Sequence, residues 1–370
     1  MVLLNAIFEN SNKFYFEGEI IRIKLEVNLE KSSILNNVIA NFVGLGTYLG
    51  NVEDKENKTM TAESKIKPKN TTEIYFDDVL PIFLCENKES AMWSKGTQVF
   101  MFAYQLPHNV PSSIESTQGF VRYSVNLSVD IDGVTVKKTE HFTLLAKTDV
   151  STNENAHLPG IIWEPENEWC IILSVFCKGN RVRTFLHISK QGYVPGECLF
   201  INAEITNLHR CPVEWVKATL VQFIKFCGSK SLVEKRNVAE ITRGCILPRD
   251  TQTWKSESVL IPAIPPTTRN RKRIISVKYK LLFHYKPSWR KKPVELSHNI
   301  FVGTVRLSQC KLPNKRGEGE GLSNSEVFNG SNLEPCVFGP HSIDVDGDVN
   351  DENESSSTFS PLYPIHSGFQ

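Results

Sequence analysis

Apolar and polar residues alternate along most of the chain before Lys311, which is the pattern of β-strands with one buried face. Between Val121 and Ile131 every second residue is apolar, and the run ends at Asp132-Gly133, a dipeptide typical of a two-residue hairpin turn. An earlier run has the same period, with its apolar positions at Ile21, Ile23, Leu25, Val27 and Leu29. No window sustains a helical period over several turns. The pattern therefore predicts an all-β fold built of antiparallel sandwiches.

The chain also repeats itself at an offset of 178 residues. Gly18-Glu19 falls on Gly196-Glu197, and the apolar positions of 21–27 fall on apolar positions of 199–205. The strand pattern that follows matches at the same offset without a gap. Two alternating runs match easily by chance, but a shared Gly-Glu start and an ungapped second strand favour a duplicated domain.

Charge divides the chain into two parts. The protein has 370 residues and a net charge of +1, which argues against a dedicated nucleic-acid binder. Residues 311–370 contain three basic and ten acidic residues, so the tail carries −7 and the rest of the chain +8. The tail is also rich in Gly, Ser and Asn, a composition that cannot bury enough apolar area to offset its ordering entropy. We therefore expect a disordered acidic C-terminal tail.

Several stretches resemble the arrestin superfamily, most closely the α-arrestins (arrestin domain-containing proteins). Tyr15-Phe16-Glu17-Gly18-Glu19 is similar to the turn before the family's second strand, and Gly192 to Glu197 is similar to the start of the arrestin C-domain. Phe301-Val302-Gly303-Thr304 resembles part of that domain's closing strand. The resemblance covers about residues 5–308. It implies two tandem immunoglobulin-like β-sandwiches at 1–152 and 170–310, a hinge at 153–169, and the tail at 311–370.

The resemblance also implies an adaptor and not an enzyme. α-Arrestins link membrane-protein cargo, such as receptors or transporters, to ubiquitin ligases and the endocytic machinery. A cytoplasmic location, with transient presence at the plasma membrane or endosomes, agrees with the odd number of cysteines (nine), the lack of Cys-x-x-Cys pairs and the lack of a secretory signal pattern. The alternative from another class is a structural sorting-coat subunit of the related retromer type. An extracellular adhesion sandwich is disfavoured by the same cysteine and signal patterns.

The end of the tail differs from the family's usual ligase-binding motif. α-Arrestins commonly carry Pro-Pro-x-Tyr there, whereas this chain has Ser360 where the first proline belongs. Loss of that proline is expected to weaken binding to an aromatic groove that recognises polyproline. The apolar residues at this end form either a short linear motif or a strand that pairs back onto an edge; the candidate motif is Phe359, Pro361, Leu362, Tyr363 and Pro364.

Motifs for catalysis or cofactor binding are missing. There is no P-loop, nucleophile elbow or His-Glu-x-x-His sequence, and no histidine has metal-ligand spacing to Cys or another His. The acidic run Asp344 to Asp348 has its glycine at position four, whereas a calcium loop needs it at position six. We expect no cofactor and no metal.

A basic segment between Arg269 and Lys292 contains no acidic residue. One interpretation is that it forms solvated faces and loops of neighbouring strands. The other is a patch for anionic lipid head groups or phosphorylated cargo tails, because Lys and Arg are attracted to acidic membranes and Arg pairs with phosphate. The residues of this candidate patch are Arg269, Arg271, Lys272, Arg273, Lys278, Lys280, Arg290, Lys291 and Lys292.

Overall fold

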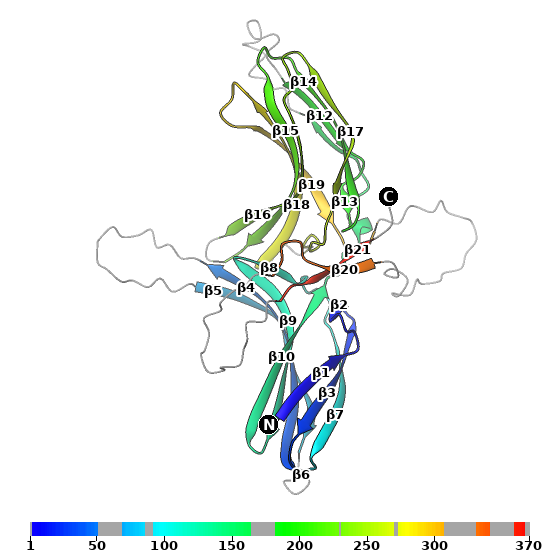
Figure 1. Ribbon diagram of the computed structural model, residues 1–370, viewed down its shortest axis with the longest axis vertical. Coiled ribbons are helices and arrows are strands. Elements are labelled where there is room, and N and C mark those ends of the chain that lie inside the picture. Colours follow the sequence, from blue (N-terminus) through cyan, green and yellow to red (C-terminus); the bar gives the residue numbers. More distant parts are fainter. Residues whose placement is uncertain are drawn as a thin grey trace, which may run out of the picture.

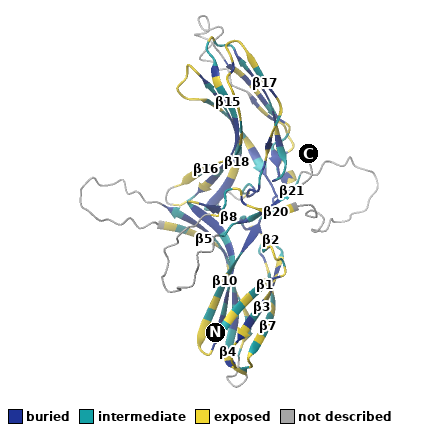
Figure 2. Cartoon of the chain, viewed as in Figure 1, coloured by how far each residue is buried: buried dark blue, intermediate teal, exposed yellow. Residues whose placement is uncertain are grey.

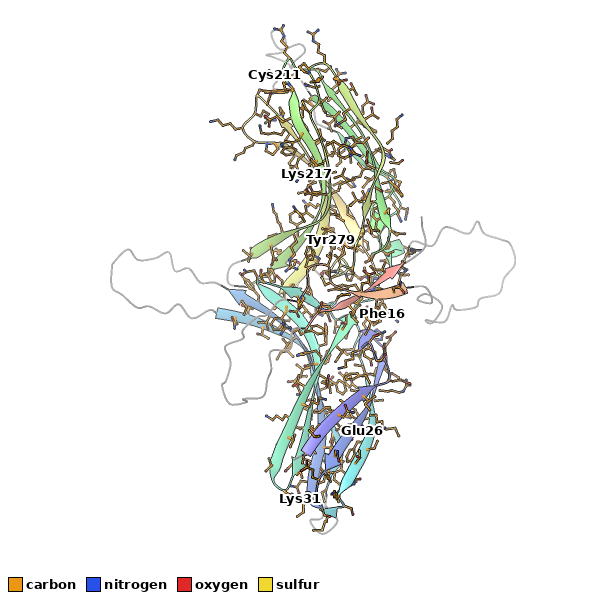
Figure 3. All side chains as sticks on the ribbon, viewed as in Figure 1. Phe16, Glu26, Lys31, Cys211, Lys217 and Tyr279 are labelled. Carbon is orange, nitrogen blue, oxygen red and sulfur yellow. The ribbon has the colours of Figure 1, made fainter. Side chains whose placement is uncertain are left out.

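A computed structural model describes residues 2–50, 69–85, 92–163, 182–228, 231–269, 273–306, 331–340 and 359–366. These residues form two β-sandwiches that lie end to end, with two strands from the C-terminal region at their junction (Figure 1). Lys31 lies at the far end of the first sandwich and Cys211 at the far end of the second, whereas Phe16 and Tyr279 lie toward the junction (Figure 3). The predicted all-β, double-sandwich fold is confirmed.

The first sandwich packs a three-stranded sheet against a seven-stranded one. The smaller sheet has the order β1-β3-β7, with strands at Val2–Phe8, Ile20–Leu29 and Gly96–Gln105. The larger sheet has the order β2-β10-β9-β4-β5, with strands at Phe14–Phe16, Val134–Leu145, Gly119–Ile131, Ser33–Gly50 and Lys69–Leu84. Two short strands extend it, since β6 (Met92–Trp93) pairs with β4 and β8 (Ile114–Ser116) pairs with β9.

The second sandwich has a four-stranded and a five-stranded sheet. The first of these has the order β11-β12-β14-β17, at Gly160–Trp163, Val182–Ile188, Cys198–Asn207 and Thr251–Leu260. The other has the order β13-β19-β18-β15-β16, at Gly192–Tyr193, Val294–Val302, Ile275–Pro287, Val213–Phe226 and Leu232–Arg243.

The two sandwiches share one topology, as the sequence repeat predicts. In each, a short strand pairs parallel with the last strand of the sandwich: β2 with β10, and β13 with β19. The remaining pairings of the larger sheet follow in the same order in both halves. The strands that the 178-residue offset superposes, β3 and β14, both lie between two antiparallel neighbours.

The alternation seen in the sequence is the burial pattern of the strands. Along β3, the residues from Ile21 to Leu29 alternate between buried and outward-facing positions. Figure 2 shows the buried residues along the strands and exposed residues along the outer faces and turns. Fully burying a Leu or Ile side chain stabilises the fold by about 1.5–3 kcal/mol. The predicted hairpin is present: Asp132 and Gly133 both have positive φ (53° and 77°) and join β9 to β10, the geometry of a type I′ turn.

The connection between the sandwiches differs in detail from the expected hinge at 153–169. A short 3₁₀ helix, η2 (Val150–Thr152), leads into turns, and residues 160–163 already form β11, which pairs with β12. The residues from 164 to 169 lie outside the described part of the chain. Residues 160–163 form a strand and not a linker because their backbone pairs with β12 and extends the sheet of the second sandwich.

Part of the tail is ordered, contrary to the expectation of disorder over 311–370. Residues 331–335 form β20 and residues 362–366 form β21, and the two strands pair antiparallel. The composition argument fails here because residues 336–338 and 362–365 are locally apolar, and the surface of the junction supplies the buried area that the tail alone lacks. The other tail residues lie outside the described part of the chain, including the acidic run 344–348.

Candidate functional site at the interdomain junction

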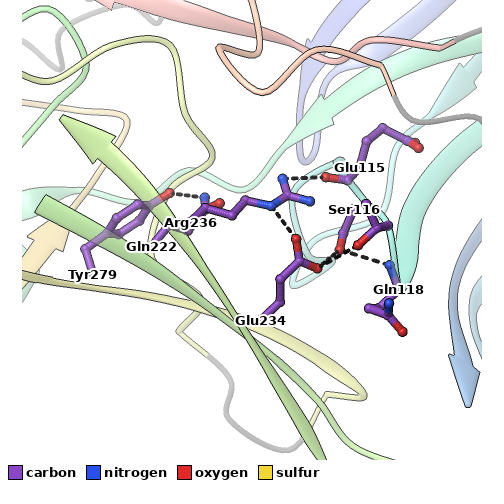
Figure 4. A network of polar contacts seen from close by, with 8 residues as sticks. Glu115, Ser116, Gln118, Gln222, Glu234, Arg236 and Tyr279 are labelled. Carbon is purple, nitrogen blue, oxygen red and sulfur yellow. Dashed lines mark hydrogen bonds and ion pairs between the residues drawn. The ribbon is translucent and has the colours of Figure 1, made fainter. Parts of the chain in front are cut away.

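A network of polar side chains joins the two sandwiches (Figure 4). In the first sandwich, the Glu115 carboxylate on β8 accepts two hydrogen bonds from the Arg122 guanidinium on β9, both at 2.7 Å. The Glu115 side chain is fully buried, and this burial raises the pKa of its carboxyl group, an effect that Arg122 opposes. A buried carboxylate persists only when it is paired in this way, so the pair fixes the position of β8 at the junction.

Two residues of β16 reach from the second sandwich to this strand. The Glu234 carboxylate accepts hydrogen bonds from the hydroxyl groups of Ser116 and Thr117. The Arg236 guanidinium donates to Glu234 (2.6 Å) and to the backbone carbonyl of Glu115 (3.1 Å). Both side chains are largely buried. The sandwiches are therefore connected by charge-assisted hydrogen bonds with most of the water excluded, which makes them stronger than surface ion pairs.

A second contact lies at the start of β18. The Arg273 guanidinium donates to the Glu73 carboxylate (2.8 Å) and to the Asn109 carbonyl (2.7 Å), both in the first sandwich. The same guanidinium lies over the Tyr75 ring, 5.1 Å from its centroid. Arg273 is thus used inside the interface, and it is not a free member of a surface patch.

Glu17 organises the chain where it leaves the first sandwich. Its carboxylate accepts hydrogen bonds from the backbone N–H of Asn109 (2.6 Å) and of Lys147 (2.8 Å). Further on, the Thr148 N–H donates to the Thr304 hydroxyl (2.8 Å), which ties the connection to the end of β19. The Glu-Gly-Glu turn found in the sequence therefore has a structural role, because it anchors the interdomain connection.

A cavity of about 180 Å³ lies between these contacts. Side chains of the first sandwich, among them Glu17 and Ile114, form one wall, and residues 265–269 of the second form another, including Pro266 and Arg269. The cavity is smaller than the 300 Å³ or more typical of small-molecule sites.

The ordered part of the tail covers the same junction. We call residues 331–340 and 359–366 the tail sheet. On the first sandwich, the Tyr363 hydroxyl donates to the Ser113 carbonyl (2.8 Å), and the Leu362 N–H donates to the Thr143 hydroxyl (3.1 Å). Tyr363 is 1% exposed and packs in a hydrophobic cluster that draws on both sandwiches and the tail: Phe14, Phe16, Leu145, Ala263 and Cys336.

The tail sheet also contacts the second sandwich. The N–H of His366 donates to the Pro195 carbonyl (3.0 Å), and its ring Nε2 lies 3.1 Å from the Thr304 carbonyl. Arg306 donates to the His366 carbonyl (3.0 Å). Burial lowers the pKa of His366, so the neutral ring that donates to Thr304 is the favoured form.

The tail sheet is also linked to the polar network. The Phe338 ring lies under the Arg236 guanidinium, 5.0 Å from centroid to Cζ. One residue, Arg236, therefore contacts both sandwiches and the tail. The tail and both domains therefore meet at this one side chain.

The candidate tail motif lies in this sheet. Leu362, Tyr363 and Pro364 belong to β21, and Phe359 lies 5.5 Å from the His141 ring on β10. Pro361 and Tyr363 are buried. Of the two interpretations left open, the structure favours the strand that pairs back, although its partner is β20 of the tail itself.

The candidate basic patch does not form one surface. Arg269 is exposed beside the junction, Lys278 and Lys280 face outward on β18, and Arg290 to Lys292 lie in the turn after β18. That turn is at the far end of the domain, since β18 spans about 40 Å. Arg271 and Lys272 lie outside the described residues. The basic residues are close in the sequence but far apart in space, because a long strand separates the residues at its two ends.

The sequence alone gave no reason to select Glu115, Arg122, Glu234 and Arg236. The last two occupy inward positions of β16, where an alternating strand should place apolar residues. A charged residue at a strand position that should face inward is a signal for such a site. It can be recognised only when it is known which residues of the strand face inward. Among the described residues, no group of His, Cys, Asp or Glu is suited to hold a metal ion. Among them there is also no helix long and apolar enough to cross a membrane.

Two tandem sandwiches of equal topology, joined by a buried polar interface, define the architecture of this chain as a double-sandwich scaffold. Residues 4–151 match the family Arrestin (or S-antigen), N-terminal domain, and residues 178–307 match Arrestin (or S-antigen), C-terminal domain. The chain therefore belongs to the arrestin family, whose members are non-enzymatic.

The similar proteins are distant relatives of the α-arrestin type. Arrestin domain-containing protein 17 of Caenorhabditis elegans is 24% identical over 323 residues, which cover 84% of this chain and 72% of that protein. Arrestin domain-containing protein 1 of Mus musculus is 23% identical over 219 residues, or 59% of this chain and 48% of its own length. The protein of the same name from Rattus norvegicus is 23% identical over 274 residues, covering 72% and 60%. The predicted family resemblance is confirmed.

Proposed function

We propose that this protein is a cytoplasmic trafficking adaptor that binds membrane-protein cargo, such as receptors or transporters, and promotes its endocytosis, sorting or ubiquitin-dependent transport. The observation that supports this function is the pair of arrestin domains held in one arrangement by a buried interface. Adaptor roles are typical of this family. A scaffold of this kind acts by presenting strand edges and loops to partners, and it needs no catalytic group.

The tail sheet suggests how binding is controlled. It contacts both domains, through Ser113 and Thr143 on one side and Pro195 and Thr304 on the other. As long as it stays there, the two domains keep their relative position and the surface beneath it is closed to partners. Its departure exposes that surface and frees the domains to adjust to cargo.

Recruitment of a ubiquitin ligase through the tail requires the same departure. The segment Ser360-Pro361-Leu362-Tyr363 is the nearest match to a Pro-Pro-x-Tyr motif, and its tyrosine is 1% exposed. A recognition domain that binds an extended proline-containing segment needs that tyrosine in solution. Ligase binding is therefore proposed only for the state in which the tail sheet has left the junction.

Contact with anionic lipids is proposed for a smaller surface than the sequence indicates. Lys278 and Lys280 share the outward face of β18, and no carboxylate of the described residues pairs with either. Replacing both by Glu should reduce binding to vesicles that contain acidic phospholipid. The same change at Lys291 and Lys292 tests whether the basic turn at the far end of the second sandwich also binds these vesicles. Equal binding by all variants would remove lipid contact from the proposal.

Proximity labelling in cells with the full chain as bait tests the adaptor role. The proposal expects integral membrane proteins and trafficking factors at substoichiometric, variable levels. Stable, stoichiometric recovery of coat subunits would instead support a structural coat role and contradict the proposal.

A further inference from the structure

The edge strands of the two sandwiches differ in how they are protected against pairing with another strand. An exposed edge presents unpaired N–H and C=O groups, and proteins commonly guard it with charges, prolines or bulges. The edge strand β5 carries three acidic residues and Pro81, and β16 carries charged residues along its length. The edge strand β17 carries Lys255 and Glu257, and its pairing with β14 contains a register shift.

The edge strand β7 has none of these features. Its ten residues, Gly96–Gln105, include no charge and no proline, and they pair with β3 without a register shift. Within the described ranges, no other strand pairs with its second edge. At the opposite edge of this sheet, β1 is also uncharged, but Lys138 of the neighbouring sheet reaches across it and donates to the Leu4 carbonyl (3.2 Å).

The outward face of β7 is apolar as well. Met101 is 81% exposed, the highest value for a large hydrophobic side chain among the described residues, and Val99 is 48% exposed. On the inward face, Phe100 and Phe102 are only partly buried, because the edge of the sandwich is open beside them. Two apolar side chains and the margins of two rings are thus exposed along one unpaired strand.

We propose that β7 pairs antiparallel with β7 of a second copy of this chain. The sequence of β7 suits a second copy: an antiparallel strand opposite itself brings like charges together unless it has none, and β7 has none. A two-fold axis through Met101 places Met101 opposite Met101 and Val99 opposite Ala103, so outward faces meet outward faces. The result is a closed dimer in which two three-stranded sheets become one continuous sheet.

The test is sedimentation equilibrium of the full chain over a wide concentration range, under reducing conditions. The wild type should reach a monomer–dimer equilibrium. Met101→Lys and Met101→Glu should each weaken dimerisation by roughly tenfold or more, because like charges then face each other across the axis. A mixture of the two variants should restore it, because Lys then faces Glu. Val79→Lys, on the guarded edge β5 at a position 62% exposed, is the matched control and should dimerise as the wild type does.

Thermal unfolding of every variant verifies that the fold is kept, which is expected for such exposed positions. A wild type that stays monomeric throughout overturns the proposal. So does a dimer that Met101→Lys leaves intact, since the contact would then lie elsewhere. Loss in both single variants without rescue in the mixture also overturns the proposed pairing, because Lys and Glu at position 101 would then not face each other across the axis.

Discussion

Replacing Tyr363 by Ala should release the tail sheet from the junction without unfolding the two sandwiches. The Tyr363 ring is 1% exposed and packs with residues of both domains, among them Phe16 and Ala263. Removing a buried aromatic side chain costs about 3–5 kcal/mol, and loss of the hydrogen bond to the Ser113 carbonyl adds about 1 kcal/mol. These contacts form only when the tail sheet is in place. Their loss therefore weakens the binding of the tail sheet to the junction and leaves the stability of the two sandwiches unchanged.

A loss of about 4 kcal/mol raises the released fraction roughly a thousandfold. Hydrogen exchange measured by mass spectrometry reports this fraction, since the His366 N–H is protected by the Pro195 carbonyl and the Leu362 N–H by the Thr143 hydroxyl. Both amides should exchange much faster in Tyr363→Ala, while amides of β3 and β18 keep their protection.

Two variants serve as controls. Tyr363→Phe keeps the ring and loses only the hydrogen bond, so it should raise exchange by about fivefold, equivalent to about 1 kcal/mol. Val337→Ala changes a tail-sheet residue that is 51% exposed and should leave exchange near the wild-type rate. If Tyr363→Ala shows wild-type protection at both amides, the contacts at Tyr363 do not hold the tail and the reasoning is refuted.

Three further predictions concern the junction. Burial lowers the pKa of His366 below its usual 6.5, so this histidine takes up a proton more readily when the tail is released. The tail sheet should therefore be progressively lost from the junction as the pH falls below about 6.5. Hydrogen-exchange rates that stay constant with pH, after correction for intrinsic pH effects, would contradict this. Gly303→Ala should lower the free energy of unfolding by about 1–3 kcal/mol, because its Cβ would lie 2.5 Å from a methyl group of the interdomain connection, whereas Gly244→Ala meets nothing within 4 Å and should be neutral in chemical denaturation. Arg236→Ala should cost about 3 kcal/mol, since it breaks a largely buried charge pair, and Lys235→Ala on the outer face of the same strand less than about 1 kcal/mol; equal denaturation midpoints would remove the polar network from the account.

The fold could be predicted from the sequence because its determinants are local and periodic. The alternation in Ile21 to Leu29 sets which face of β3 is buried, and Asp132-Gly133 sets a hairpin. The repeat at an offset of 178 residues then predicts two similar halves. None of these inferences needs to know which residues from different parts of the chain come into contact.

The junction could not be predicted, because its contacts depend on how the two domains pack against each other, and no local sequence pattern encodes that packing. Nothing near Arg236 in the sequence indicates that it will face Glu115, which is 121 residues away. The tail illustrates the opposite error: its average composition predicts disorder, yet Leu362 and Tyr363 find a buried surface in another part of the chain. The basic segment fails for a third reason, since closeness in sequence is not closeness in space along a strand of about 40 Å.

The central claim is that the tail sheet closes the junction of an adaptor to its partners. The most direct measurement is quantitative proximity labelling in cells that express either the full chain or a chain truncated at Leu312, at equal levels. The account predicts that truncation raises the labelling of integral membrane proteins and leaves the fold of the two sandwiches intact. Equal labelling by both chains would contradict it.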